Sequence, residues 1–166
     1  VRRHVAWCFS DMLKAGIAQP GMLQYLDQKT SVGPESVAGK KKENGLNENF
    51  ARELLELHTL GVGGPYSQGD VTELAELLTG LTYSQDGVFG FRGEFAQPGA
   101  ETVLGQSYGG GTAALSDVHA ALDDLARHPA TARHLAQKMA VHFVSDRPDS
   151  ALVDAMQGRY LETGGH

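Results

Sequence analysis

Apolar residues recur at helical spacing along most of the chain and predict six or seven helices. The first stripe predicts a helix over residues 2–17 and consists of Val5, Phe9, Met12, Leu13 and Ile17. Pro20 suits the start of a short helix over residues 21–27. Similar stripes predict helices over residues 47–60, 116–127, 129–144 and 149–161. A further helix is predicted to begin after Ser67, because Ser67 and Asp70 fit a capping box.

Two of these helices have an apolar face that we expect to point into the core. In the 47–60 helix this face consists of Phe50, Leu54, Leu57 and Leu60. In the 129–144 helix it consists of Ala132, Leu135, Ala136, Met139, Ala140 and Phe143. Residues 28–46, by contrast, carry Gly33-Pro34 and a run of three lysines, Lys40 to Lys42, and predict an exposed loop.

Glycine dominates residues 82–111, where the helical spacing stops. Asp86-Gly87 lies between two apolar runs, a pattern typical of a type I′ hairpin turn. Residues 101–104 predict a further short strand, and residues 109–111 predict a flexible connection. The sequence therefore predicts a mainly α, bundle-like single domain over residues 1–166, with a small β-hairpin and Gly-rich excursion at residues 82–111.

Charge and cysteine content exclude several classes of protein. The 166 residues hold 14 Lys and Arg against 20 Asp and Glu, a net charge of −6. This balance argues against a nucleic-acid-binding protein, because phosphate neutralisation needs a cationic stripe. No apolar run approaches the roughly 20 residues that span a bilayer. The single cysteine, Cys8, excludes an intramolecular disulfide and a multi-thiolate metal site.

The densest group of polar side chains lies on the predicted 47–60 helix and consists of Asn47, Glu48, Asn49, Arg52, Glu53, Glu56 and His58. Glu53 and Glu56 are three residues apart on one face, so this pair could hold a divalent metal ion. A ladder of ion pairs from Glu48 through Arg52 to Glu56 explains the same spacing. His58 suits the helix C-terminus, where a partial negative charge accumulates. Both interpretations stay open.

Other catalytic or ligand-binding patterns are weaker. The serines lack the Gly-x-Ser-x-Gly context of a hydrolase nucleophile, and the histidines lack the His-Glu-x-x-His spacing of a zinc helix. No motif indicates an organic cofactor. The aromatic residues of the Gly-rich excursion either pin it to the helices or line a groove for a glycan or peptide; they are Tyr83, Phe89, Phe91, Phe95 and Tyr108.

The chain resembles the bacterial family named domain of unknown function 1800. The most specific segment is residues 46–62, which includes Leu46-Asn47-Glu48-Asn49-Phe50-Ala51-Arg52-Glu53-Leu54. Residues 22–27, 31–33, 66–75, 78–80, 128–133 and 138–144 extend the resemblance over nearly the whole chain. The family pattern differs at Ala96-Gln97-Pro98-Gly99-Ala100-Glu101-Thr102, where it has His-Asp-Pro-Gly-Pro-Lys-Thr. A site that used this His and Lys is impaired here.

The resemblance implies a setting and no reaction. Family members are longer, which agrees with a chain that begins within a helical pattern, without Met, and ends on a helix-stop sequence. We therefore expect an internal fragment of a longer protein. Many members are exported and encoded beside another exported family. This implies a periplasmic or secreted location and, as a partner, another exported protein encoded nearby.

Two functions from different classes remain, and whether the protein is an enzyme stays open. The first is a helical scaffold or partner-binding module. The second is a metal-assisted hydrolase or oxidoreductase that uses the Asn49 to Glu56 helix face. Burial of Glu53 and Glu56 facing each other would favour a metal ion. An Arg52 guanidinium on these carboxylates would favour the scaffold.

Overall fold

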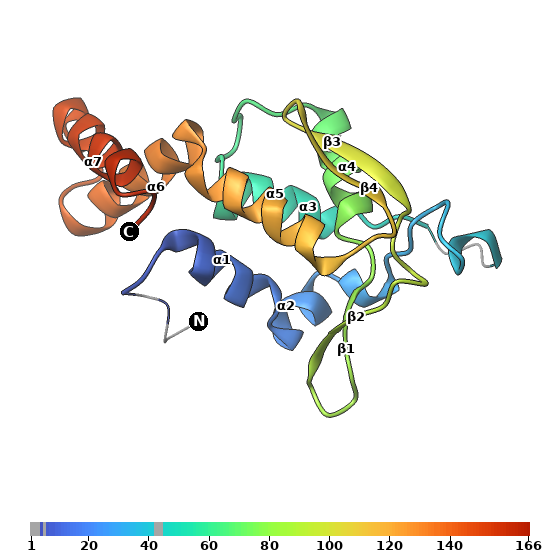
Figure 1. Cartoon of the computed structure of the whole chain (residues 1–166). Coiled ribbons are helices and arrows are strands. Elements are labelled where there is room, and N and C mark those ends of the chain that lie inside the picture. Colours follow the sequence, from blue (N-terminus) through green and yellow to red (C-terminus); the bar gives the residue numbers. More distant parts are fainter. Residues whose placement is uncertain (1–3, 5, 42–44) are drawn as a thin grey trace.

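The structure is a computed structural model that describes residue 4, residues 6–41 and residues 45–166. Helices dominate it, with two small antiparallel sheets at one end (Figure 1). The helices are α1 (Phe9–Ile17), α2 (Pro20–Tyr25), α3 (Asn49–Glu53), α4 (Gln68–Leu77), α5 (Leu115–Arg127), α6 (Pro129–Phe143) and α7 (Ser150–Glu162). One π-helical turn, Leu54–His58, continues α3. The predicted fold class, mainly α with a small hairpin region, is confirmed.

The first helix is shorter than predicted. Of the predicted range, residues 2, 3 and 5 lie outside the described residues, and Cys8 has extended backbone. The Phe9 N–H donates to the Gly165 carbonyl over 2.9 Å. In a longer helix this N–H would donate to a carbonyl of the preceding turn. The hydrogen bond from Phe9 to Gly165 also places the beginning of α1 beside the C-terminal segment (Figure 1).

Each small sheet is a single hairpin. Strand β1 (Leu81–Tyr83) pairs with β2 (Phe89–Phe91), and β3 (Gly99–Val103) pairs with β4 (Gln106–Gly111). The prediction of a flexible connection at residues 109–111 is wrong, because these glycines belong to β4. Gly109 has a φ of 88°, and a Cβ there would lie 2.6 Å from the Gly99 carbonyl oxygen. Glycine is therefore required by the close approach of β3.

The type I′ turn is also at a different place from the predicted one. In the first hairpin the Gly87 N–H donates to the Ser84 carbonyl, and only Gly87 has a positive φ. A type I′ turn needs positive φ at both central residues, so the prediction for Asp86-Gly87 is wrong. The second hairpin meets this requirement at Leu104 and Gly105, with φ of 51° and 79°.

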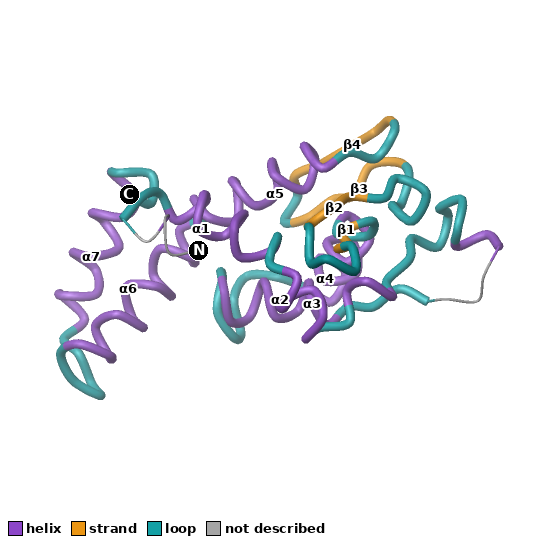
Figure 2. The backbone as a smooth tube through the Cα atoms, turned by 90° about the horizontal axis from the view of Figure 1, so that it is seen from below, coloured by secondary structure: helices purple, strands orange, loops and turns teal. Residues whose placement is uncertain are grey.

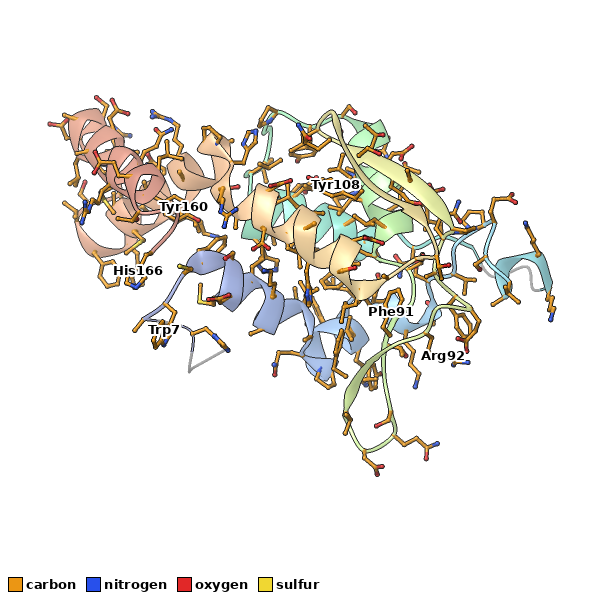
Figure 3. The ribbon with its side chains drawn as sticks, viewed as in Figure 1. Trp7, Phe91, Arg92, Tyr108, Tyr160 and His166 are labelled. Atoms are coloured by element: carbon orange, nitrogen blue, oxygen red, sulfur yellow. The ribbon has the colours of Figure 1, made fainter. Side chains whose placement is uncertain are left out.

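Two separate apolar clusters hold the molecule together. The larger one fills the space between α1 to α5 and the sheets, and its most deeply buried side chains include Phe50, Leu23, Leu54, Leu74 and Leu122. The smaller one lies between α6 and α7 and consists of Ala136, Ala140 and Val153, with Met156 packed against them. Figure 2 shows this helical hairpin standing apart from the body. Tyr160 joins it to α5 by donating to the Ala126 carbonyl over 2.7 Å (Figure 3).

In the predicted 47–60 and 129–144 helices, three side chains that the apolar stripes predict to be inward are exposed instead. Leu57 is exposed because it lies on the π-helical turn, which holds an extra residue and shifts the facing of those that follow. Met139 and Phe143 lie on α6 but outside the strip that α7 covers, which consists of alanines. The apolar face of α6 is therefore wider than the strip that α7 covers among the described residues.

The remaining local predictions concern caps and loops. Ser67 and Asp70 form the predicted capping box of α4, and Asp149 caps α7 through the Ala151 N–H. Of the predicted loop at residues 28–46, the described residues 28–41 and 45–46 are largely loop with two short turns, Gln28–Thr30 and Gly39–Lys41, and Lys40 pairs with Glu35. Lys42 lies outside the described residues. In the part of the chain that the structure describes, no helix has the length and apolar character needed to cross a membrane.

Candidate functional site

Asn47 fastens the preceding loop to the start of α3. Its side-chain amide donates to the carbonyls of Leu26 and Asp27, and its Oδ1 accepts from the Asn49 N–H over 3.0 Å. Its own N–H donates to Ser31 Oγ. These bonds hold Asn47 outside the helix, so the prediction of a helix that begins directly after it is displaced by one residue. α3 begins at Asn49.

Glu48 is the centre of a polar network that ties α3 to α4. Its carboxylate accepts from Thr72 Oγ1 over 2.7 Å, from Gln68 Nε2 over 2.8 Å and from Arg52 Nη2 over 3.2 Å. The Thr72 and Gln68 hydrogen bonds, together with Arg52, hold the pKa of Glu48 below its ordinary value. Arg52 also donates to Gln68 Oε1 over 2.9 Å. The network joins helices that the chain itself separates by a long loop.

Glu56 lies on the other side of the same guanidinium. Its Oε1 is 3.7 Å from Arg52 Nη1, and its negative charge also acts on the Tyr66 phenol. Burial of the phenol, together with the Glu56 charge, raises the pKa of Tyr66 above its ordinary value. Arg52 therefore bridges Glu48 and Glu56, which is the ladder that the sequence spacing predicts.

Glu53 does not join this ladder. Among the described residues it has no hydrogen bond or ion pair, and its side chain is partly exposed. Across the same part of the chain, no three His, Cys, Asp or Glu side chains come together in an arrangement suited to a metal ion. The assignment of Glu53 and Glu56 as ligands of a divalent metal stays a prediction, and the geometry gives it no support.

His58 is the last residue of the π-helical turn, and among the described residues no hydrogen bond or ion pair joins it to the other six. The Thr59 hydroxyl donates to the Leu54 carbonyl over 2.8 Å, and the Gly61 N–H donates to the Leu55 carbonyl over 3.0 Å. These bonds close the turn and direct Leu54 and His58 to the wall of an apolar cavity of about 330 Å³ beside α1. Burial lowers the pKa of His58, so its imidazole is neutral at pH 7.

Helix α6 closes the outer side of this turn. Lys138 Nζ donates to the Leu57 carbonyl over 3.2 Å, and His134 Nε2 lies 3.4 Å from the same oxygen. A cation at the last carbonyls of a helix satisfies groups that have no partner within the helix. Residues of α6 thus contact this helix end, and the interaction of His58 with it stays a prediction.

The complete chain, residues 1–166, matches the family model described as protein of unknown function (DUF1800). The chain belongs to the DUF1800 family. No curated protein and no solved structure matches it. The resemblance that residues 46–62 suggest is therefore confirmed over the full length.

The DUF1800 chain contains one buried acidic residue that the sequence analysis did not select. Glu101 on β3 is only 4 % exposed. Burial and the neighbouring carboxylates of Glu76, Glu73 and Asp117 raise its pKa to about 7. A signal was available, because Glu101 and Val103 alternate along a strand and so share its inner face. It also stands where the family pattern has Lys.

The aromatic residues of this DUF1800 chain serve mainly to pack the hairpins. Tyr83, Phe89 and Phe91 are partly buried against the main core. Tyr108 is buried and donates its hydroxyl to Asp124 over 2.9 Å (Figure 3). Phe95 lies under the guanidinium of Arg92 at 4.1 Å. Pinning of the excursion accounts for these positions, and a glycan or peptide groove on them stays a prediction.

Proposed function

We propose that this DUF1800 chain is a helical scaffold that binds a protein partner through an exposed face of α6. The single observation that carries the proposal is the exposure of Met139 and Phe143 on α6 and of Val144 directly after it. Phe143 and Val144 are 75 % and 64 % exposed. Large apolar side chains gathered at one place on a surface mark interaction sites.

The position of this α6 face supports a docking role. The same helix buries Ala136 and Ala140 against α7, and its apolar stripe continues past that contact to Met139 and Phe143. The hairpin stands away from the main body, so a partner can reach it without displacing the core (Figure 2). The polar network of α3 and α4 then has a separate duty, which is to hold the scaffold together.

A protein surface suits this face better than a lipid surface. Membrane-binding helices carry Lys and Arg along their polar face to meet anionic headgroups. Here Arg133 pairs with Asp154 at 2.7 Å, Asp146 and Arg147 offset each other, and the chain has a net charge of −6. An apolar surface of another exported protein, encoded nearby, is the partner that the family resemblance indicates.

The test is titration calorimetry with the purified product of the neighbouring gene. The parent chain should bind, and Phe143→Ser should weaken binding at least about tenfold, because interface aromatics often dominate affinity. Val88→Ser is the matched control, since Val88 is equally apolar and 64 % exposed but lies between β1 and β2. All three proteins should melt alike, because neither side chain is buried.

Three results would overturn the proposal. The first is no binding to the neighbouring protein. The second is binding that Phe143→Ser leaves unchanged. The third is an alternative occupant: self-association in light scattering, or sedimentation with anionic vesicles, that disappears in Phe143→Ser and persists in Val88→Ser.

A further inference from the structure

The apolar cavity beside the π-helical turn contains one unusual group, the His58 imidazole. Its other walls are mainly apolar side chains of α1 and α2 together with Leu54, and Gln19 is the second polar residue of the lining. No described residue forms a hydrogen bond with the His58 ring, although the residue is half-buried. The ring nitrogens are not fully buried, so they can bond either water or a ligand in the cavity.

The π-helical turn is the reason that this ring faces the cavity. Such turns are rare and occur frequently at functional sites. In this turn the Thr59 hydroxyl bonds the Leu54 carbonyl and Lys138 bonds the Leu57 carbonyl. The side chains of Leu54 and His58 line the cavity. The turn therefore presents one polar group to a space whose other lining residues, apart from Gln19, carry no polar side chain.

Charge near the cavity determines which ligands fit. Burial keeps His58 neutral, and the two charged side chains that act on it, Glu53 and Lys138, have opposite signs. The site therefore offers no net charge to hold an anionic or cationic ligand. A neutral imidazole has one N–H donor and one nitrogen acceptor, which suits a hydroxyl or a carbonyl group.

We propose that this cavity binds a small neutral amphiphile, an apolar molecule with a single hydroxyl or carbonyl group that hydrogen-bonds to His58. A volume of about 330 Å³ falls in the range of small-molecule sites. A space of this size accommodates a medium-length hydrocarbon chain. This site is separate from the α6 face and does not depend on the partner proposed above.

The glycines of the helices provide a sharp test. Gly16 lines the cavity, and a Cβ added there would meet nothing within 4 Å. Gly16→Leu should therefore fill the cavity without disturbing the fold, and it should raise the Tm, because Leu favours a helix more than Gly does. Gly158 on α7 is equally open, so Gly158→Leu is the matched control.

The probe is 1-octanol. Isothermal titration calorimetry and the chemical shifts of the His58 ring protons measure its binding. The parent and Gly158→Leu should bind it, and Gly16→Leu should bind roughly tenfold more weakly or not at all. His58→Phe keeps an aromatic wall but removes the hydrogen bond, so it should also weaken 1-octanol. Octanoate and octylammonium should bind more weakly than the alcohol.

The proposal fails if 1-octanol does not bind, or if Gly16→Leu and Gly158→Leu bind it equally. It also fails if His58→Phe has no effect on its affinity, or if octanoate or octylammonium binds more tightly than 1-octanol. A Tm of Gly16→Leu at or above that of the parent establishes that lost binding is not lost folding. None of these variants changes Phe143, so failure of this test leaves the proposed partner-binding function intact.

Discussion

Gly61 lies directly against the imidazole of His134. A Cβ on Gly61 would stand 2.7 Å from His134 Nδ1, and the φ of Gly61 is 91°. This contact seats α6 on the end of the π-helical turn, where His134 and Lys138 both reach the Leu57 carbonyl. The junction between the two parts of the molecule thus depends on the smallest side chain available.

Substitution of Gly61 should be more harmful than substitution of a neighbouring glycine. Gly61→Ala should lower the free energy of unfolding by about 3 kcal/mol, because it adds a steric overlap to the cost of a positive φ. Gly63 also has a positive φ, 73°, but open space around it. Gly63→Ala should therefore cost only about 1 kcal/mol. Urea denaturation of both variants measures the difference, and equal losses would contradict the contact.

The network around Glu48 predicts that the Glu48→Gln variant loses stability in a pH-dependent way. Glu48→Gln should cost about 1 kcal/mol at pH 7, because the carboxylate accepts three hydrogen bonds. The pKa of Glu48 is lowered in the folded state, so the stability it contributes is present above its ordinary value of 4.5 and is lost as the pH falls through the folded pKa. Thermal melts should therefore show the parent and variant converging in acid.

Glu53→Gln is the control for this experiment, since Glu53 makes no hydrogen bond or ion pair among the described residues. It should leave the Tm unchanged at pH 7. Melts with divalent ions and with a chelator can be run on the same proteins. A shift in the parent that Glu53→Gln abolishes would favour the metal-site hypothesis over the scaffold.

Glu101 predicts the opposite pH dependence. Its folded pKa, about 7, lies above the ordinary value of 4.5, so the folded state binds the proton more tightly. The parent should then lose stability as the pH rises from 4.5 to about 7. Glu101→Gln removes this loss and should be about 1 kcal/mol more stable than the parent at pH 8, with no advantage below pH 4. Denaturation at the two pH values decides the matter.

A lysine at this position offers a second comparison. Glu101→Lys would place an ammonium among Glu73, Glu76 and Asp117, the carboxylates that surround this position. It should also stabilise the protein at pH 8, and this gain should shrink as the pH falls and those carboxylates are protonated. If both variants are less stable than the parent at pH 8, the Glu101 carboxyl is not held in an unfavourable charged state.

Asp70 should contribute more to the free energy of unfolding than an ordinary helix cap does. Its Oδ2 accepts from the Ser67 N–H over 2.7 Å, and its Oδ1 accepts from the N–H of Leu104 over 2.7 Å. Leu104 has a positive φ, so this bond supports a conformation that leucine rarely adopts. Asp70→Ala should cost about 2 kcal/mol or more, whereas Asp149→Ala removes a cap alone and should cost about 1 kcal/mol. Guanidinium denaturation of both variants tests the ranking.

Local sequence patterns were sufficient for most of the helices. The positions of α5, α6 and α7 follow from their apolar stripes, because burying one face of a helix imposes a 3.6-residue period. The α4 capping box could be predicted because it involves residues three apart. The link from Glu48 to Arg52 to Glu56 was predictable for the same reason, since i, i+4 neighbours meet on any helix.

Contacts between distant segments decided the rest. Gln68 and Thr72 complete the Glu48 network from another helix, and no spacing within residues 47–60 could indicate them. The π-helical turn places His58 at the wall of the cavity, and contacts with Thr59, Gly61 and α6 stabilise this turn.

The sequence by itself determined the family, the helical class and the polar ladder, because each depends on neighbours along one element. Only the tertiary structure decided that Glu101 is buried among carboxylates, that Met139 and Phe143 have no covering partner in the described chain, and that His58 faces an apolar cavity. The physical reason is that burial is a property of the whole packing arrangement. A helix period shows which residues share a face, but it does not show what covers that face.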